Sequence, residues 1–232
     1  MSCILNIETS TSVCSVALSA NGEVLFEKAS FEGPSHAALL GVFVEEALSV
    51  LKERGGKLDA VAVSSGPGSY TGLRIGVSVA KGLCFGFGIP LIGIHTLDIM
   101  AATAIKQNRT AADCLYCAML DARRMEVYAA IYDASLKLVR ETTADIVEAE
   151  TYASYLEKGK VCFFGNGAAK CKPVIASPNA LFMEDIHPLA VNMIPLAEEA
   201  FAAGKFEDTA YFEPFYLKEF QATVAKNKVL GN

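Results

Sequence analysis

Apolar and polar positions near the start of the chain follow the two-residue period of β-strands. Apolar residues predominate over positions 4–7, alternate with polar ones over 13–19 and return over 23–28. Asn21-Gly22, between the last two runs, is a strong hairpin signal. We therefore predict a three-strand antiparallel meander. The polar turn at 8–12 holds one carboxylate and four hydroxyls, so it could bind a metal or a phosphate, or its hydroxyls could satisfy one another locally.

Four later segments carry apolar residues at helical spacing instead. They predict helices over 36–52, 73–85, 97–106 and 194–203, with Ser35 as the N-cap of the first. Short apolar runs at 61–63, 89–94 and 161–164 predict buried strands between and after these helices. The mixture of strands and helices indicates an α/β fold.

The first meander recurs 113 residues later in the chain. Ile7-Glu8 falls on Leu120-Asp121, and the strand at 16–18 falls on 129–131 without a gap. Such a repeat implies two similar α/β lobes that face each other. Duplicated lobes of this kind resemble the actin, sugar-kinase and Hsp70 superfamily, a ribonuclease H-like architecture; this step is an analogy of fold and does not give function. We expect an N-terminal lobe over 1–97 and a C-terminal lobe over 98–232, with the end of the chain packing back on the first lobe.

A glycine-rich turn and a helix with a bare stripe form the most specific stretch of the chain. Gly66, Gly68 and Gly72 surround one proline, but their spacing matches neither the dinucleotide fingerprint nor a Walker A loop. Ser65 and Ser69 make a weak nucleophile elbow. Gly72, Gly76 and Ala80 then lie four residues apart, and each helical glycine costs roughly 1 kcal/mol against alanine. The pattern favours a tight strand-to-helix turn followed by a helix against which another helix packs closely.

The composition limits the classes of function. The net charge of −6 argues against broad nonspecific nucleic-acid binding, which depends on Lys and Arg. The start of the chain has no signal-peptide pattern, and no long uncharged apolar run predicts a membrane span. Seven scattered cysteines fit a reducing compartment, so we expect a cytoplasmic protein. Cys114 and Cys117 fall in one predicted strand and should face opposite sides of a sheet, which disfavours a shared metal or redox site.

The second copy of the meander carries charge at its turn. Asp121 is followed by Arg123 and Arg124 between two buried strands. This cluster could bind a phosphate or form an ion pair with the opposite lobe. It could equally be a solvated turn with a local salt bridge of little energetic value.

Six segments of the chain are distinctive: ILNIETSTSVCSVALS, the helix that begins at His36, SSGPGSYTGLRIGVSVAKGL, LDARRMEVYAA, GNGA, and PFYL near the end. Together they resemble the bacterial TsaB (YeaZ) family. The resemblance implies a non-catalytic subunit of the machinery that makes threonylcarbamoyladenosine next to the anticodon of tRNA. That family is similar to the transferase TsaD, whose His-x-x-x-His metal motif has no counterpart among His36, His95 and His187. No catalytic residue, no metal site and no required cofactor are therefore expected, although ATP or ADP could bind at the interface of the complex.

The resemblance also implies partners and the residues that bind them. It implies a heterodimer with a TsaD-like protein, a TsaE-like ATPase that joins it, a homodimer when the chain is alone, and only indirect contact with tRNA. Carried over by position, the partner-binding residues are His36, Leu39, Leu40, Phe43, Gly72, Ile75, Gly76 and Val79. A degenerate nucleotide or phosphate site would comprise Glu8, Thr9, Ser10, Asp121 and Arg123. Two alternatives remain open: an ATP-dependent phosphotransferase or ATPase with Glu8 and Asp121 around magnesium, and a metallopeptidase.

Overall fold

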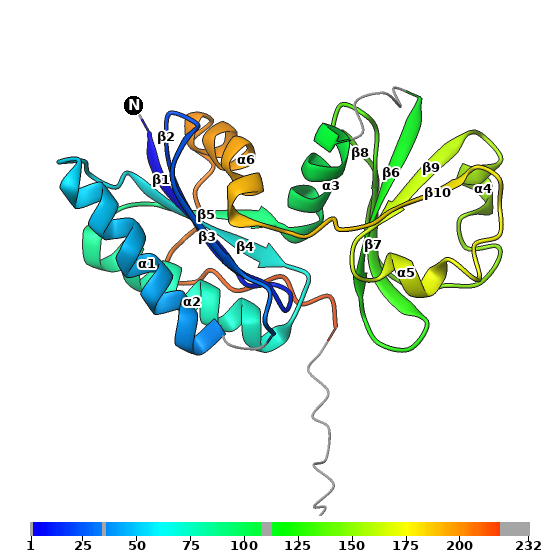
Figure 1. The fold of residues 1–232 in the computed structure, drawn as a ribbon, viewed down its shortest axis with the longest axis horizontal. Coiled ribbons are helices and arrows are strands. Elements are labelled where there is room, and N and C mark those ends of the chain that lie inside the picture. The colour runs from blue at the N-terminus through cyan, green and yellow to red at the C-terminus, as the bar shows by residue number, and fades with distance from the viewer. Residues whose placement is uncertain (1, 34–35, 108–112, 219–232) are drawn as a thin grey trace, which may run out of the picture.

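The computed structural model describes residues 2–33, 36–107 and 113–218, and these form two lobes, each built on one five-stranded sheet (Figure 1). The expected N-cap at Ser35 and the final residues 219–232 lie outside the described residues. The two sheets have the same plan, because each begins with an antiparallel meander and adds parallel strands on the other side. The duplication that the sequence repeat predicts is therefore present.

The first sheet follows the predicted meander and two crossovers. Its strand order is β3-β2-β1-β4-β5, with β1 antiparallel to β2 and parallel to β4. The elements are β1 (Cys3–Glu8), β2 (Cys14–Ala20), β3 (Glu23–Ser30), α1 (His36–Glu53), β4 (Ala60–Gly66), α2 (Tyr70–Phe87) and β5 (Leu91–His95).

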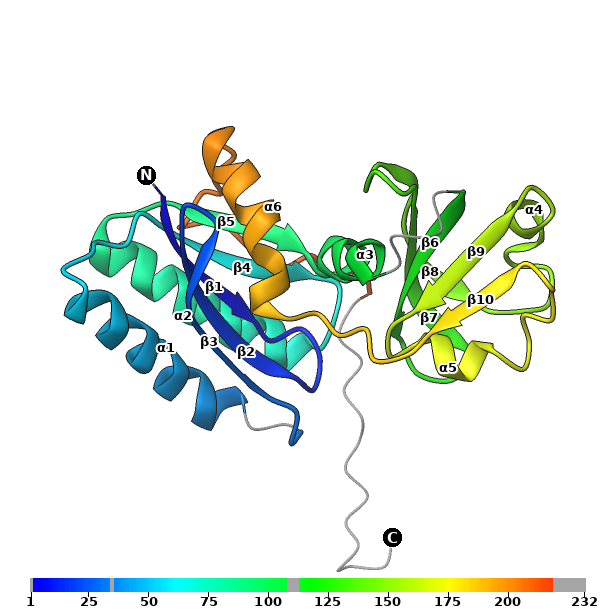
Figure 2. The same cartoon turned by 45° about the horizontal axis from the view of Figure 1, so that its top comes forward.

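The two faces of the first sheet are covered by different helices. Alternate side chains of β1 and β4 point to opposite faces, as the period of a strand requires. Leu5 and Val61 join a cluster with side chains of α1 and α2. Ile4 and Ala62 join another cluster, with Met193 and Ala197 of α6 (Ala190–Ala202). Figure 2 shows α1 and α2 side by side on one face and α6 on the other.

The second sheet has the order β10-β9-β6-β7-β8. Its elements, after α3 (Thr96–Gln107), are β6 (Cys114–Asp121), β7 (Glu126–Tyr132), β8 (Leu138–Ile146), α4 (Ala153–Leu156), β9 (Lys160–Phe164), α5 (Ala168–Cys171) and β10 (Ala180–Met183). Helix α3 covers one face and α4 with α5 the other. Cys114 and Cys117 lie in the clusters of opposite faces, as their spacing predicts.

Helix α6 follows the second sheet in the chain but packs on the first. It begins four residues earlier than its apolar pattern indicates, at Ala190, whose N–H donates to the Ser15 hydroxyl at 2.9 Å. Met193 and Ala197 then reach the first sheet. Residues beyond α6 continue on the same lobe, where Glu207 pairs with Leu91 of β5.

Candidate functional site

The polar turn after β1 lies directly against the start of α2. Ser69 caps α2, since its hydroxyl accepts the Gly72 N–H at 3.3 Å, and its own N–H donates to the Ser10 carbonyl at 2.6 Å. This cap explains why α2 begins at Tyr70, three residues before the periodicity indicates. The Thr9 hydroxyl donates to the Gly72 carbonyl at 2.8 Å. The turn is thereby held by α2 rather than open to a ligand.

Three glycines make this close approach possible, and we call Gly68, Gly72 and Gly76 the inward glycines. A Cβ added to Gly68 would lie 2.3 Å from the Ser10 carbonyl oxygen. Added to Gly72 or Gly76, it would lie 2.1 Å from the Thr9 carbonyl oxygen or 2.3 Å from the Thr9 hydroxyl. The bare stripe of α2 therefore packs against a turn of the same lobe. The prediction that another helix packs there is wrong.

Glu8 is buried beneath this turn with incomplete hydrogen bonding. One carboxylate oxygen accepts the Ser10 N–H at 2.5 Å, while Oε2 has no partner among the described residues. Burial raises the pKa of Glu8 to about 7, although the hydrogen bond from the Ser10 N–H acts in the opposite direction. The Ser10 hydroxyl is also buried and unpartnered within the described chain. The Thr9 hydroxyl is satisfied by α2 and not by the other hydroxyls of the turn, whereas Glu8 Oε2 and the Ser10 hydroxyl have no partner among the described residues.

The corresponding turn of the second lobe is exposed and internally paired. Asp121 forms an ion pair with Lys170 and accepts the Arg123 N–H at 3.0 Å. The Asp121 N–H donates to the Asn166 side chain at 2.9 Å. Among the described residues, no hydrogen bond or ion pair joins Asp121 or Arg123 to Glu8, Thr9 or Ser10. The members of the predicted phosphate site therefore form two separate groups, one in each lobe, and the structure does not join them into one site.

Most of the residues predicted to bind a partner face the interior of the first lobe. His36, Leu40, Phe43, Gly72 and Gly76 are all buried. The prediction that these five form an exposed contact is wrong, because they lie on the sides of α1 and α2 that meet the sheet and the turn. His36 shows this directly, since its Nε2 lies 3.2 Å from the Val13 carbonyl oxygen. Leu39, Ile75 and Val79 are partly buried and remain at the surface.

The sides of α1 and α2 that point away from the sheet carry a different set of residues. Val42, Phe85 and Phe87 are exposed by 47%, 88% and 53%. Three helical glycines, which we call the outward glycines, have nothing within 4 Å of an added Cβ: Gly41 in α1, and Gly82 and Gly86 in α2. We call Val42, Phe85, Phe87 and the outward glycines the outward face. The sequence carries a signal for it, since Ser78, Gly82 and Gly86 are spaced four apart like the inward stripe.

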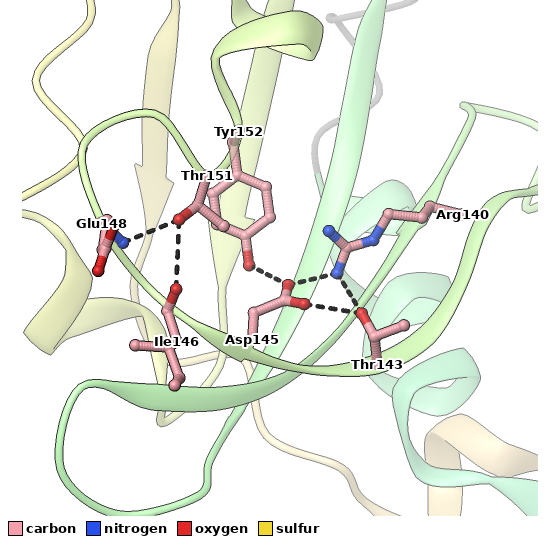
Figure 3. Close-up of polar contacts among 7 residues, drawn as sticks. All are labelled: Arg140, Thr143, Asp145, Ile146, Glu148, Thr151 and Tyr152. Atoms are coloured by element: carbon pink, nitrogen blue, oxygen red, sulfur yellow. Dashed lines mark hydrogen bonds and ion pairs between the residues drawn. The ribbon is translucent and has the colours of Figure 1, made fainter.

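The second lobe contains a connected polar cluster that is structural. Asp145 forms an ion pair with Arg140 and accepts the Tyr152 hydroxyl at 2.7 Å (Figure 3). The Thr143 hydroxyl donates to the same carboxylate at 2.8 Å. Burial, the neighbouring Cys117 and Asp145 together raise the pKa of Tyr152 far above its usual range, so it stays a neutral donor. The cluster ties the edge strand β8 to the segment before α4.

A cavity of about 600 Å³ lies between the lobes. Its walls include His95 at the end of β5, Asp98 of α3 and Tyr132 of β7, and the Tyr132 hydroxyl donates to Asp98 at 2.6 Å. Phe215, near the end of the described chain, also lines it.

In residues 2–33, 36–107 and 113–218, no three His, Cys, Asp or Glu side chains are grouped to hold a metal ion. Within the same ranges, every helix is too short or too polar to cross a membrane.

Comparison with known proteins gives three concordant results. Residues 29–226 match the model of the TsaD family, described as tRNA N6-adenosine threonylcarbamoyltransferase. The chain is 33% identical to the tRNA threonylcarbamoyladenosine biosynthesis protein TsaB of Escherichia coli, over 98% of each chain, and 30% identical to that of Bacillus subtilis, over 74% of each. A crystal structure from Pseudomonas aeruginosa, described as similar to peptidase YeaZ, matches with a TM-score of 0.80 and 28% identity over 94% of this chain and 100% of that one. The two-lobe, actin-like fold expected from the repeat is confirmed.

Proposed function

Because the chain belongs to the TsaB (YeaZ) family and so takes part in tRNA threonylcarbamoyladenosine biosynthesis, we propose that it is a non-catalytic subunit that docks a TsaD-like transferase on its outward face. One observation carries the proposal. Gly41, Gly82 and Gly86 lie inside helices, where each costs roughly 1 kcal/mol against alanine, and no contact with the described residues of the lobe accounts for them. A partner that approaches the helix backbones closely would account for all three.

The exposed aromatic residues of the outward face support the same proposal. Phe85 leaves 88% of its surface in solvent, and Val42 and Phe87 lie on the same pair of helices. Large apolar side chains left exposed on neighbouring helices favour an interaction surface, and aromatic residues often supply most of the binding energy of an interface. The partly buried Leu39, Ile75 and Val79 extend this surface along α1 and α2.

The packing of the first turn supports a role without catalysis. Thr9 and Ser10 lie against the inward glycines, so their backbone is too closely covered for a phosphate to approach. Glu8, the carboxylate that an ATPase of this fold would place near magnesium, is buried and has a pKa near neutrality. The chain then needs no cofactor of its own, and ATP or ADP would enter only at the interface with the partner.

The proposal names further partners. A TsaE-like ATPase would join the heterodimer, tRNA would be held mainly by the other subunits, and the isolated chain would form a homodimer through the same outward face. A homodimer is expected because self-association would bury the apolar surface that the partner otherwise covers.

A matched pair of glycine substitutions tests the outward face. Gly82→Trp should lower capture of a purified TsaD-like protein at least tenfold, because the indole would hold the two surfaces apart. Gly159→Trp is the control, since this glycine of the second lobe also has nothing within 4 Å of an added Cβ. Gly76→Trp is no test of docking, because it would collide with Thr9 inside the lobe.

Two results would contradict the proposal. Capture of the TsaD-like protein by Gly82→Trp at wild-type strength would remove the outward face as the docking surface. Formation of threonylcarbamoyladenosine on tRNA by the chain alone, or magnesium-ATP binding that Glu8→Ala abolishes, would replace a subunit role with an enzymatic one.

A further inference from the structure

The chain after α6 returns along the first lobe, and we call residues 205–218 the strap. The Glu207 N–H donates to the Leu91 carbonyl at 2.9 Å, which adds the strap to the free edge of β5. From α2, the Lys81 ammonium donates to the carbonyls of Ala210 and Phe212, both at 3.0 Å. In Figure 1 the strap is orange-red and runs across the first lobe to the space between the lobes.

The first lobe is shaped to receive the strap. An added Cβ at Gly93 of β5 would lie 2.9 Å from the Glu207 carboxylate and 3.1 Å from the Phe212 ring. Phe212 packs against the core cluster that α1 and α2 cover. The strap is therefore bound by backbone pairing, by two hydrogen bonds to one lysine and by an apolar anchor.

The end of the strap occupies the space between the lobes. The Phe215 N–H donates to the Ser65 carbonyl at 2.7 Å, at the carboxyl end of β4. The Phe215 ring meets His95 edge-on with 5.7 Å between ring centroids, and it lines the cavity that Tyr132 bounds from the second lobe. The ring of Tyr216 lies 4.8 Å from that of Tyr70 at the start of α2.

One contact carries the strap onto the second lobe. Lys218 forms an ion pair with Glu126 at the start of β7. An exposed pair of this kind contributes little energy by itself. It nevertheless places a single segment in contact with β5, α2, the end of β4 and β7, so the strap touches both lobes.

We propose that the strap is an intramolecular clamp that fixes the angle between the lobes by seating Phe215 in the cavity between them. Two lobes that share a limited interface move relative to each other unless something holds them. A segment tethered to the same chain acts at a high effective concentration, so even modest contacts keep it seated. The clamp holds the second lobe in a fixed orientation relative to the outward face.

Distance measurements on the whole chain test the clamp. Spin labels at Glu45→Cys in α1 and Lys158→Cys after α4 report the separation of the lobes, and the seven native cysteines are all buried. Combining Phe215→Ala with Lys218→Ala should broaden the distance distribution. It should also speed hydrogen exchange of the residue 215 amide at least tenfold, because the bond to Ser65 opens more often.

The strap itself supplies the matched control. Tyr211→Ala removes an aromatic ring from the same segment, but this ring is 84% exposed and makes none of the contacts above. It should leave both the distance distribution and the exchange rate as in the wild type. Lys218→Glu should give a smaller broadening that Glu126→Lys reverses in the double variant.

Either of two results would overturn the proposal: an unchanged distance distribution in the Phe215→Ala, Lys218→Ala variant, or equal broadening by Tyr211→Ala. The measurement uses the chain alone and needs no partner. Failure of the clamp and failure of the proposed docking function are therefore separate outcomes.

Discussion

Gly72 and Gly76 of the inward set and Gly82 and Gly86 of the outward set all lie in α2, each pair four residues apart, yet the two pairs lie in opposite environments. An added Cβ at Gly72 would meet the Thr9 carbonyl oxygen at 2.1 Å, whereas one at Gly82 would meet nothing within 4 Å. At Gly72 the loss of helix propensity is offset inside the lobe by close packing and by the hydrogen bond from Thr9. At Gly82 no contact with the described residues of the lobe offsets the loss of helix propensity. A glycine stripe on a helix is therefore ambiguous until the face that meets the sheet is known.

The largest expected effect comes from filling the inward set. Gly72→Ala should lower the free energy of unfolding by about 3 kcal/mol, because backbone atoms of the turn, which cannot rotate away, must move. Urea unfolding followed by circular dichroism measures this. If Gly72→Ala lowered the free energy of unfolding by less than the roughly 1 kcal/mol that alanine gains in helix propensity, the turn would be able to move away from the added methyl group at little cost.

The buried carboxyl beneath the inward set gives the next effect. The pKa of Glu8 is about 7 in the folded chain and ordinarily 4.5, so between these values the folded state binds more protons than the unfolded state. Stability should therefore fall as pH rises through this window, by about 2–3 kcal/mol in all, and stay low above it.

Glu8→Gln isolates that contribution. The amide cannot ionise, so the variant should be more stable than the wild type at pH 8 and should lose most of that advantage at pH 5. Parallel urea titrations at the two pH values give the comparison. A wild type whose stability rises from pH 5 to pH 8, relative to Glu8→Gln, would mean that Glu8 is ionised and paired in the fold.

The smallest effect is expected on the outward set, with the opposite sign. Gly82→Ala should raise the free energy of unfolding of the isolated chain by about 1 kcal/mol, because alanine favours the helix and its methyl group meets nothing. Thermal unfolding at a concentration where the chain is monomeric measures it. Destabilisation by Gly82→Ala would mean that the glycines of α2 do not divide into two classes.

The sequence was sufficient for most of the fold because its signals are local. The repeat at an offset of 113 aligns β1 with β6 and β2 with β7 in the sequence. The hairpin signal at Asn21-Gly22 predicts the second turn of the meander. Helices α1 and α3 begin and end within about one residue of their apolar periodicity. Such patterns depend on neighbours a few positions away.

The site depends on contacts that no local pattern contains. Spacing predicted that another helix packs against Gly72 and Gly76, whereas their environment is set by Thr9, more than sixty positions earlier in the chain. His36 and Phe43 were carried over from the family resemblance as partner-binding residues, and the periodicity of α1 gives an apolar side but not what covers it. The four-residue spacing of Ser78, Gly82 and Gly86 was the signal left unused.

The placement of α6 has a consequence for how the chain is made. All five strands of the first sheet have left the ribosome once residue 95 is free, but the face that carries Ile4 and Ala62 lacks the cover of Met193, Ala197 and Ala200 until residues 190–202 follow. The whole second sheet is translated in that interval and is contiguous from residue 114 to residue 183. The later half of the chain is thus able to complete its own sheet before the earlier half is finished, and a nascent chain stopped before residue 190 would expose an apolar surface for chaperones to cover.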